Sequence, residues 1–274
     1  MSHIGHVRTI NQDTFILATV HKRTEVHATN LPRLSSAGAA DDRLATLAAV
    51  ADGIGSGIGG EQASRSAIAE LTRYLTYVRR CWETHDEEGE DFTEALQHAA
   101  LECHRHLREV RERDPDLTGL ATTLTLVVGV WPWIYLLQVG DSRYYLYRDG
   151  VLRQVTHDQT YAQDLVDQGI LSRSEAAQSM VANLLTSAVG GVNFEPMVSR
   201  IKSDWRNVHL LCSDGLTRHV PDDLIAERLR TMTSAKQVCE RLVKDALENG
   251  GTDNVTVIVG RAVPLPGALL PGPA

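Results

Sequence analysis

Aspartates recur at the ends of apolar runs in this sequence. An apolar segment, an Asp and then a small or polar residue appear in AAVADG, LLQVGDS, HLLCSDG and GGTDN, and NQD near the start adds a fifth Asp. One such Asp is explained by the preference of Asp and Gly for turns. Several are harder to explain, because strand ends can converge, and two carboxylates about 5 Å apart repel by roughly 3 kcal/mol at an effective dielectric near 20. The repeated pattern predicts a shared cationic counterion.

Divalent metal is the counterion that these residue types favour. The aspartates concerned are Asp13, Asp52, Asp141, Asp214 and Asp253. Only Arg143 and Arg218 lie inside the motifs to balance them. Carboxylate oxygens suit hard ions such as Mg²⁺ or Mn²⁺, whereas zinc prefers His and Cys. Two hard ions bridged by one Asp would lower the pKa of a bound water and generate hydroxide, and such centres mainly hydrolyse phosphate esters. Arg8, five residues before Asp13, is the candidate phosphate-binding group.

Histidine and cysteine do not suggest a competing metal site. His98, His104 and His106 fall on different faces of one predicted helix, so we expect them to be solvated. The cysteines form no CxxC pair and are expected to be reduced and mostly buried. They are Cys81, Cys103, Cys212 and Cys239.

One motif contains an alternative chemistry. Cys212 and Arg218 have the Cys-x5-Arg spacing of cysteine-dependent phosphatases, in which a thiolate attacks phosphorus. Short signatures of this kind do not transfer between families. Asp214 would also repel a phosphate dianion there, and Leu211 stands where that family has His. We therefore expect Cys212 to be a buried residue of a strand.

Hydrophobic periodicity predicts the elements that must position these residues. Apolar residues spaced three and four apart indicate helices over 62–80, from Asp91 onward, over 222–229 and over 235–247. Strands are expected at 15–18, 44–51, 123–128, 134–139, 208–212 and 255–259. Asp149-Gly150 between two strand-like runs predicts a hairpin, and hence antiparallel sheet.

The sequence predicts a single domain with two long connections and a C-terminal tail. The polar segment 156–192 is expected to be a helix-poor functional flap, and 21–42 a second long loop. Residues 262–274 are rich in Pro and Gly and read as a tail, which leaves 1–261 as a single domain.

Composition excludes several classes of function. The 274 residues include 27 Lys and Arg against 35 Asp and Glu, a formal charge of −8, which argues against a nucleic-acid binder. An aromatic content of 5% supplies few stacking platforms for single strands. No apolar run approaches the roughly 18 residues that would span a bilayer, and the start lacks an apolar leader. We expect a cytoplasmic protein that binds no membrane.

Six motifs in order resemble the metal-dependent Ser/Thr protein phosphatases, the PPM or type 2C family, in its compact bacterial form. They are VRTINQD, VADGIGSGIGGEQAS, ATTLTL, QVGDSRYYLYRDGVL, LCSDGLT and GGTDNVTVIV. The resemblance implies an α+β fold, a central β-sandwich of two antiparallel sheets flanked by helices on both sides. It also implies a monomeric enzyme that dephosphorylates phosphoserine and phosphothreonine in proteins and so reverses a Ser/Thr kinase.

Carried over by position, the resemblance assigns metal ligands. Asp52 would bridge two Mn²⁺ or Mg²⁺ ions, and the Gly53 carbonyl would complete one of them. Asp214 and Asp253 match the remaining carboxylate ligands of the other ion. Asp141, together with Asp214, matches a weaker third metal site.

The same resemblance assigns two further roles. Asp13 would act through a bound water, which it orients, and Arg8 occupies the place of the phosphate-binding Arg. The catalytic set is therefore Arg8, Asp13, Asp52 and Asp214.

The chain departs from the family pattern at five positions. Ile54 and Gly57 stand where Met and His are usual, Gln159 where His is usual, and Ala121 where Gly is usual. Arg218 replaces an acidic residue, and its charge would oppose the third ion. A catalytically silent phosphoprotein-binding module is the alternative, which loss of a core Asp would favour. No core Asp is missing from the sequence, so we expect an active enzyme.

Overall fold

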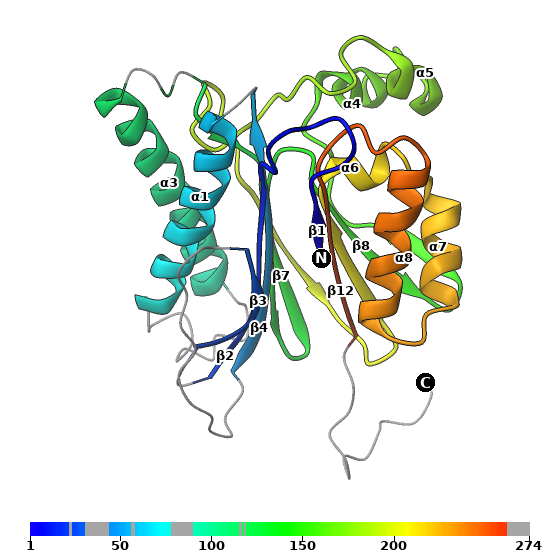
Figure 1. Cartoon of the computed structure of the whole chain (residues 1–274). Coiled ribbons are helices and arrows are strands. Elements are labelled where there is room, and N and C mark those ends of the chain that lie inside the picture. Colours follow the sequence, from blue (N-terminus) through cyan, green and yellow to red (C-terminus); the bar gives the residue numbers. More distant parts are fainter. Residues whose placement is uncertain are drawn as a thin grey trace.

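Two antiparallel sheets stacked face to face form the centre of the protein, with helices outside both (Figure 1). The computed structural model describes residues 1–21, 24–30, 44–55, 58–77, 90–114, 117 and 119–261. The predicted four-layer α-β-β-α sandwich is confirmed.

The strands form one larger and one smaller sheet, and each sheet includes strands from both halves of the chain. The larger sheet has the order β10 (Met197–Lys202), β7 (Trp133–Val139), β6 (Leu124–Val130), β4 (Ala45–Ile54), β2 (Asp13–Val20) and β3 (Thr24–Thr29), and β5 (Ala121–Thr122) pairs with the end of β4. The smaller sheet has the order β1 (Ser2–His3), β12 (Val255–Arg261), β11 (Val208–Cys212), β8 (Arg143–Arg148) and β9 (Val151–Gln154). Every strand predicted from the sequence is present, with bounds that differ from the expected ones by at most three residues.

The predicted hairpin joins β8 to β9. Asp149 and Gly150 have φ values of 50° and 88°, so both central residues adopt the left-handed conformation that a two-residue hairpin of the I′ type requires. This turn sets the register of β9 along β8.

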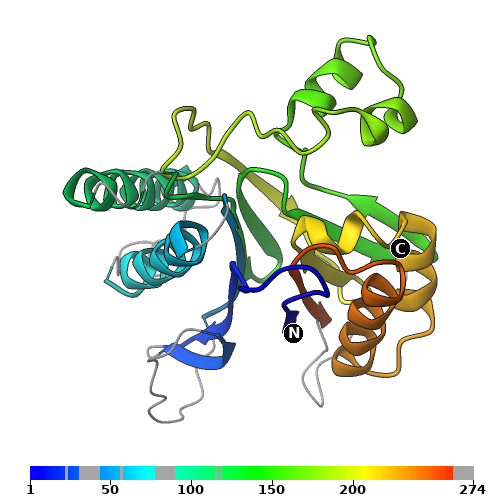
Figure 2. The same ribbon diagram turned by 45° about the horizontal axis from the view of Figure 1, so that its top comes forward.

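Amphipathic helices cover the outer faces of both sheets. α1 (Ile58–Tyr77) and α3 (Glu90–Arg113) lie on the larger sheet, and α7 (Asp222–Arg230) and α8 (Ala235–Glu248) on the smaller one (Figures 1 and 2). Their apolar stripes are buried, as the spacing predicts. Residues 78–80, the end of the predicted first helix, lie outside the described residues.

A separate apolar layer between the sheets holds them together. Phe15 and Val50 from the larger sheet meet Tyr144, Leu211 and Ile258 from the smaller one. Because this layer locks the two sheets face to face, strand ends from both sheets are brought to the same end of the sandwich.

The segment 156–192 contains two short helices, so its prediction as helix-poor was wrong. α4 (Tyr161–Asp167) starts at Thr160, whose side chain accepts a hydrogen bond from the Gln163 N–H. α5 (Arg173–Gln178) starts with a capping box between Ser172 and Glu175. Both helices are too short to show a repeating apolar stripe, and their caps were the only local signal.

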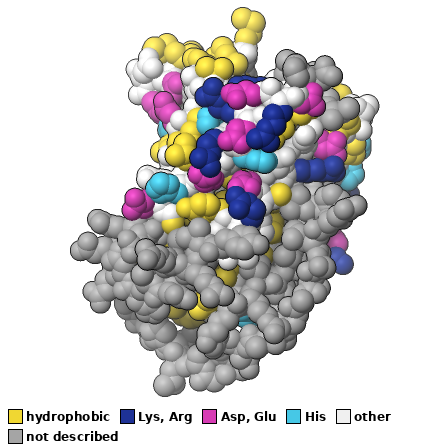
Figure 3. All heavy atoms as spheres, turned by 90° about the vertical axis from the view of Figure 1, so that its left-hand side faces the viewer, with side chains coloured by type: hydrophobic (Ala, Val, Ile, Leu, Met, Phe, Trp, Pro, Cys, Tyr) yellow, Lys and Arg dark blue, Asp and Glu magenta, His cyan; other side chains and the backbone are white. Residues whose placement is uncertain are grey.

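The outer face of α1 and α3 shows acidic and basic side chains interspersed (Figure 3). Pairs at helical spacing link them, for example Arg65 with Glu61 at 2.7 Å. His98 is exposed on this surface, as predicted. His104 contradicts the prediction of a solvated ring, because its Nδ1 accepts a hydrogen bond from the Gly190 N–H at 3.1 Å and its ring stacks on Phe194.

Several predictions fall partly or wholly outside the described residues. Of the long loop 21–42, residues 24–29 form β3, whereas the tail 262–274 and Cys81 are not described. Cys103, Cys212 and Cys239 are buried free thiols, as expected. Among the described helices, none has the length and apolarity needed to cross a membrane.

Candidate active site

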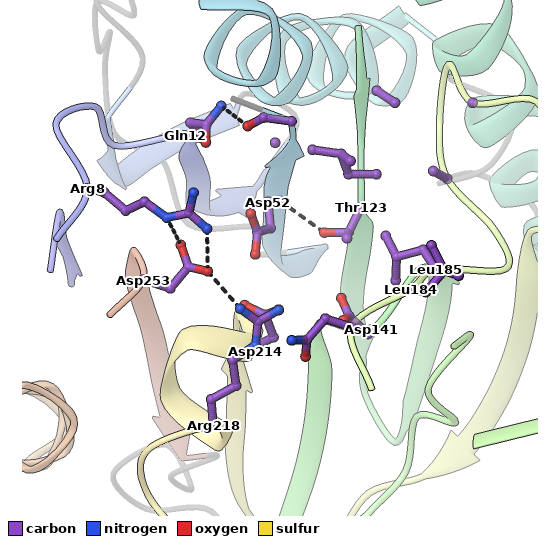
Figure 4. A pocket seen from close by; sticks show the side chains of 17 residues that line it. Arg8, Gln12, Asp52, Thr123, Asp141, Leu184, Leu185, Asp214, Arg218 and Asp253 are labelled. Atoms are coloured by element: carbon purple, nitrogen blue, oxygen red, sulfur yellow. Dashed lines mark hydrogen bonds and ion pairs between the residues drawn. The ribbon is translucent and has the colours of Figure 1, made fainter. Parts of the chain in front are cut away.

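A pocket opens at the end of the sandwich where both sheets terminate (Figure 4). Asp52 comes from the end of β4, Asp141 follows β7, and Asp253 precedes β12. Asp214 opens α6 (Asp214–Thr217), the single helical turn after β11. Arg8 lines the same pocket. The candidates predicted from separate motifs are therefore brought together.

Strand pairing places Asp13 beside Asp52. The two residues are register partners at the ends of β2 and β4. The threonine pair of the ATT motif then fixes the backbone of Asp52: the Asp52 N–H donates to Thr123 Oγ1 at 3.0 Å, and Thr122 Oγ1 donates to the Asp52 carbonyl at 2.9 Å. The role of these threonines was missed in the sequence, although the motif itself was recognised.

Glycine follows two of the aspartates because there is no space for a side chain. A Cβ on Gly53 would lie 2.1 Å from the Gly60 carbonyl oxygen, in the first turn of α1. A Cβ on Gly215 would lie 1.9 Å from the Asn254 carbonyl oxygen. Both Asp-Gly motifs therefore let neighbouring backbone approach closely behind the carboxylates.

Asp13 is fully buried behind the pocket. Ser213 Oγ donates a hydrogen bond to its Oδ2 at 2.7 Å, while its Oδ1 has no hydrogen-bond partner in the described structure. Burial raises the pKa of Asp13 to about 7, although the hydrogen bond from Ser213 favours the ionised form. Ser213 precedes the Asp of the SDG motif, and the sequence showed no other signal of this contact.

The carboxylates in the pocket perturb one another. Burial, and then repulsion between neighbouring carboxylates, raises the pKa values of Asp52 and Asp141 well above the ordinary range. Burial also raises the pKa of Asp214, although the Arg218 charge opposes it. Asp253 behaves differently: burial acts to raise its pKa, but the hydrogen bonds from Arg8 and the Asn254 N–H hold it below its usual value.

Two guanidinium groups engage part of this cluster. Arg8 binds Asp253 bidentately, with Nε to Oδ1 and Nη2 to Oδ2 both at 2.8 Å. Arg218 Nη1 donates to Asp253 Oδ2 at 2.8 Å, and its Nη2 donates to Asp214 Oδ2. In the part of the chain that the structure describes, no three acidic, His or Cys side chains are already gathered tightly enough to enclose one ion.

The donor set nevertheless fits hard divalent ions. Four aspartates and two arginines line the pocket, so that if all four aspartates are ionised two negative charges are left unbalanced, and an ionised Asp13 behind it would add a third. The Oδ1 atoms of Asp13 and Asp214 are buried without a hydrogen-bond partner in the described structure. A buried carboxylate oxygen needs a proton or a cation, and an all-oxygen set selects ions of the Mg²⁺ and Mn²⁺ type.

Comparison with known proteins decides the family. Residues 32–253 match the family described as Protein phosphatase 2C. The chain belongs to this family. As a protein phosphatase 2C member, it is 37% identical over 219 residues to the Ser/Thr protein phosphatase PstP of Mycobacterium tuberculosis, covering 80% of this chain and 41% of PstP. The chain thus spans about two fifths of the length of that relative.

Two further similarities cover more of the matched protein. The Ser/Thr phosphatase Stp of Listeria monocytogenes is 30% identical over 220 residues, which are 77% of this chain and 82% of Stp. The structure of the PstP catalytic domain in complex with two manganese ions superposes with a TM-score of 0.74 at 32% identity, covering 96% of each chain. These comparisons agree with the antiparallel sandwich described above.

The geometry of this protein phosphatase 2C member does not support the cysteine alternative. Cys212 is fully buried in the core between β11 and the outer helices. Burial raises the pKa of its thiol to about 12, so a thiolate is not available near neutral pH. Arg218 directs its guanidinium group to Asp214 and Asp253 instead.

The unusual residues of the motifs fall into two groups. Ile54 and Ala121 line the pocket and make part of its wall apolar. Gln159 is buried and structural: its Oε1 accepts from the Gly140 N–H at 2.6 Å and its Nε2 donates to the Glu195 carbonyl at 2.8 Å, which supports the turn before Asp141. Gly57 lies outside the described residues.

Proposed function

We propose that this protein is a Mn²⁺- or Mg²⁺-dependent phosphatase that hydrolyses phosphoserine and phosphothreonine in proteins. The convergence of Asp52, Asp141, Asp214 and Asp253 on one pocket beside Arg8 carries the proposal, within a protein phosphatase 2C fold. PstP, a relative in that family, has been crystallised with two manganese ions. Divalent ions in such a centre supply an activated water and neutralise phosphoryl charge.

The residues that would hold the ions come from both sheets. Asp52 and the Gly53 carbonyl stand at the end of β4, and Asp214 and Asp253 stand across the pocket. Asp141 and Asp214 would form a weaker third site, which the charge of Arg218 opposes.

Asp13 would orient the attacking water. Its carboxylate is held by Ser213 on one oxygen and leaves Oδ1 without a hydrogen-bond partner in the described structure, so that this oxygen can accept a proton or a hydrogen bond. Asp13 is fixed on the same strand pair as Asp52, which keeps its position relative to the ions constant.

Arg8 would bind the substrate phosphate. Its side chain is 42% exposed at the pocket and is anchored through Asp253, so the guanidinium charge is held at the rim. A guanidinium group can bind two phosphate oxygens at once. Ile54 has no proton to donate, and the leaving alkoxide would take its proton from water.

The wider biological role follows from this activity. Residues 1–261 would act as one catalytic domain, monomeric and cytoplasmic, on phosphoproteins produced by a partner Ser/Thr kinase. Candidate phosphoproteins from the same cell are the substrates to assay.

Phosphate release from a phosphothreonine peptide tests the proposal. We expect turnover with Mn²⁺, none in excess EDTA, and loss of nearly all activity in Asp52→Asn and Asp214→Asn. Asp245→Asn is the matched control, because Asp245 pairs with Arg228 on the outer helices. Retention of more than about a tenth of the activity by either site variant, a barrier change of only about 1.4 kcal/mol, would contradict the ligand assignment. No turnover with Mn²⁺ demonstrably bound would point instead to a silent binding module.

A further inference from the structure

Arg218 is a cation in the pocket to which the proposed reaction gives no role. It follows Asp214 by four residues at the end of the single turn of α6, and its N–H donates to the Asp214 carbonyl at 2.9 Å. Side chains four apart on a helical turn lie on the same face. The sequence spacing therefore directs the Arg218 side chain back over Asp214, where it is 29% exposed.

The guanidinium group of Arg218 joins two carboxylates that would hold an ion. Nη2 donates to Asp214 Oδ2, and Nη1 donates to Asp253 Oδ2 at 2.8 Å. Figure 4 shows Arg218 reaching from α6 to these carboxylates at the side of the pocket opposite Asp52. An ion that binds Asp214 and Asp253 must displace these contacts or accept a positive charge beside it.

The backbone cannot easily move Arg218 away. Gly215 lies so close to the Asn254 carbonyl that even a methyl group would not fit between them, so α6 is pressed against the start of β12. Release of the carboxylates therefore depends on rotation of the Arg218 side chain alone.

The two sides of the pocket differ in how far their carboxylates are already paired with arginine. Asp253 has both carboxylate oxygens engaged, Oδ1 by Arg8 and the Asn254 N–H, and Oδ2 by Arg8 and Arg218. Asp214 retains one oxygen without a hydrogen-bond partner in the described structure. Asp13, next to Asp52 in the strand register, is held by the neutral hydroxyl of Ser213.

We propose that Arg218 is a tethered cation that competes with a divalent ion for Asp214 and Asp253. It makes ion binding unequal, with a tighter ion on the Asp52 side and a weaker one on the Asp214 and Asp253 side. This inference rests on the proposed function, because it assumes that the pocket holds divalent ions.

Calorimetric titration of the protein with MnCl₂, without substrate, tests the inference. We expect two classes of binding in the native protein, and in Arg218→Gln a dissociation constant for the weaker ion lowered at least tenfold, or 1.4 kcal/mol. Arg228→Gln is the matched control, because Arg228 makes the same kind of two-point contact with Asp245, with Nε at 2.6 Å and Nη2 at 3.1 Å, away from the pocket. The control should bind Mn²⁺ as the native protein does.

A second variant protects the test against misfolding. If Arg218→Gln does not fold, Arg218→Met is titrated instead; methionine keeps an unbranched side chain but carries no charge, so the weaker ion should again bind more tightly than in the native protein. Titrations of the folded variant that superpose on the native one would overturn the inference. Mn²⁺ binding to none of the proteins would reject the proposed function itself, whereas binding that is insensitive to Arg218 rejects only the competition.

Discussion

Replacement of Ser213 by alanine should destabilise the protein by roughly 2.5 to 6 kcal/mol at pH 8. The buried Ser213 hydroxyl donates to Asp13 Oδ2 at 2.7 Å and accepts from the Thr256 N–H at 3.0 Å. A hydrogen bond to a charged group contributes roughly 1.5 to 3 kcal/mol, and a buried N–H left without a partner costs roughly 1 to 3 kcal/mol. The variant loses the first and creates the second.

Urea unfolding in excess EDTA, followed by tryptophan fluorescence, measures this loss. Ser203→Ala is the matched control: Ser203 is also buried, but its hydroxyl has no hydrogen-bond partner in the described structure, so its removal breaks no hydrogen bond and should cost much less stability than Ser213→Ala. A loss in Ser213→Ala no larger than that in Ser203→Ala would refute the reasoning.

The pH dependence gives the same experiment a second readout. Burial raises the pKa of Asp13 to about 7, whereas an unfolded Asp titrates near 4. The folded protein therefore binds more protons than the unfolded chain between these values, and this carboxyl contributes less stability as pH rises through that window. Ser213 favours the ionised form, so the penalty of Ser213→Ala should be larger at pH 8 than at pH 5.

Two further changes test other parts of the structure. Arg8→Ala should chiefly raise KM for a phosphopeptide, by about tenfold, because it removes a guanidinium group from the pocket rim; an unchanged KM in steady-state assays would refute its phosphate-binding role. Burial lowers the pKa of His209, next to the Tyr144 hydroxyl at 2.7 Å, to about 4. A neutral buried His contributes stability above its unfolded pKa near 6.5, and that contribution is lost as the pH falls towards 4. The native protein should therefore lose roughly 3 kcal/mol of unfolding free energy over this pH range because of His209, and His209→Gln should not show this loss. If the free energy of unfolding, measured by urea titration, falls as steeply with decreasing pH in His209→Gln as in the native protein, His209 is not the source of the acid destabilisation.

Local patterns in the sequence were sufficient for most of the fold. The alternation of 123–128, the hairpin at Asp149-Gly150 and the periodic stripes of the long helices each depend on residues close together in the chain. The flap helices were missed because seven and six residues are too few for a period to show, and only their caps at Thr160 and Ser172 marked them.

The candidate site also depends partly on local sequence and partly on long-range contacts. The sequence by itself determined which residue types stand at the strand ends, and five aspartates after or beside apolar runs were enough to predict an oxygen-rich pocket. Tertiary structure alone decided their partners: Asp13 meets Ser213 across 200 residues, and Arg8 meets Asp253 across 245. Strand register and the packing of one sheet on the other set these contacts, and neither leaves a local pattern in the chain.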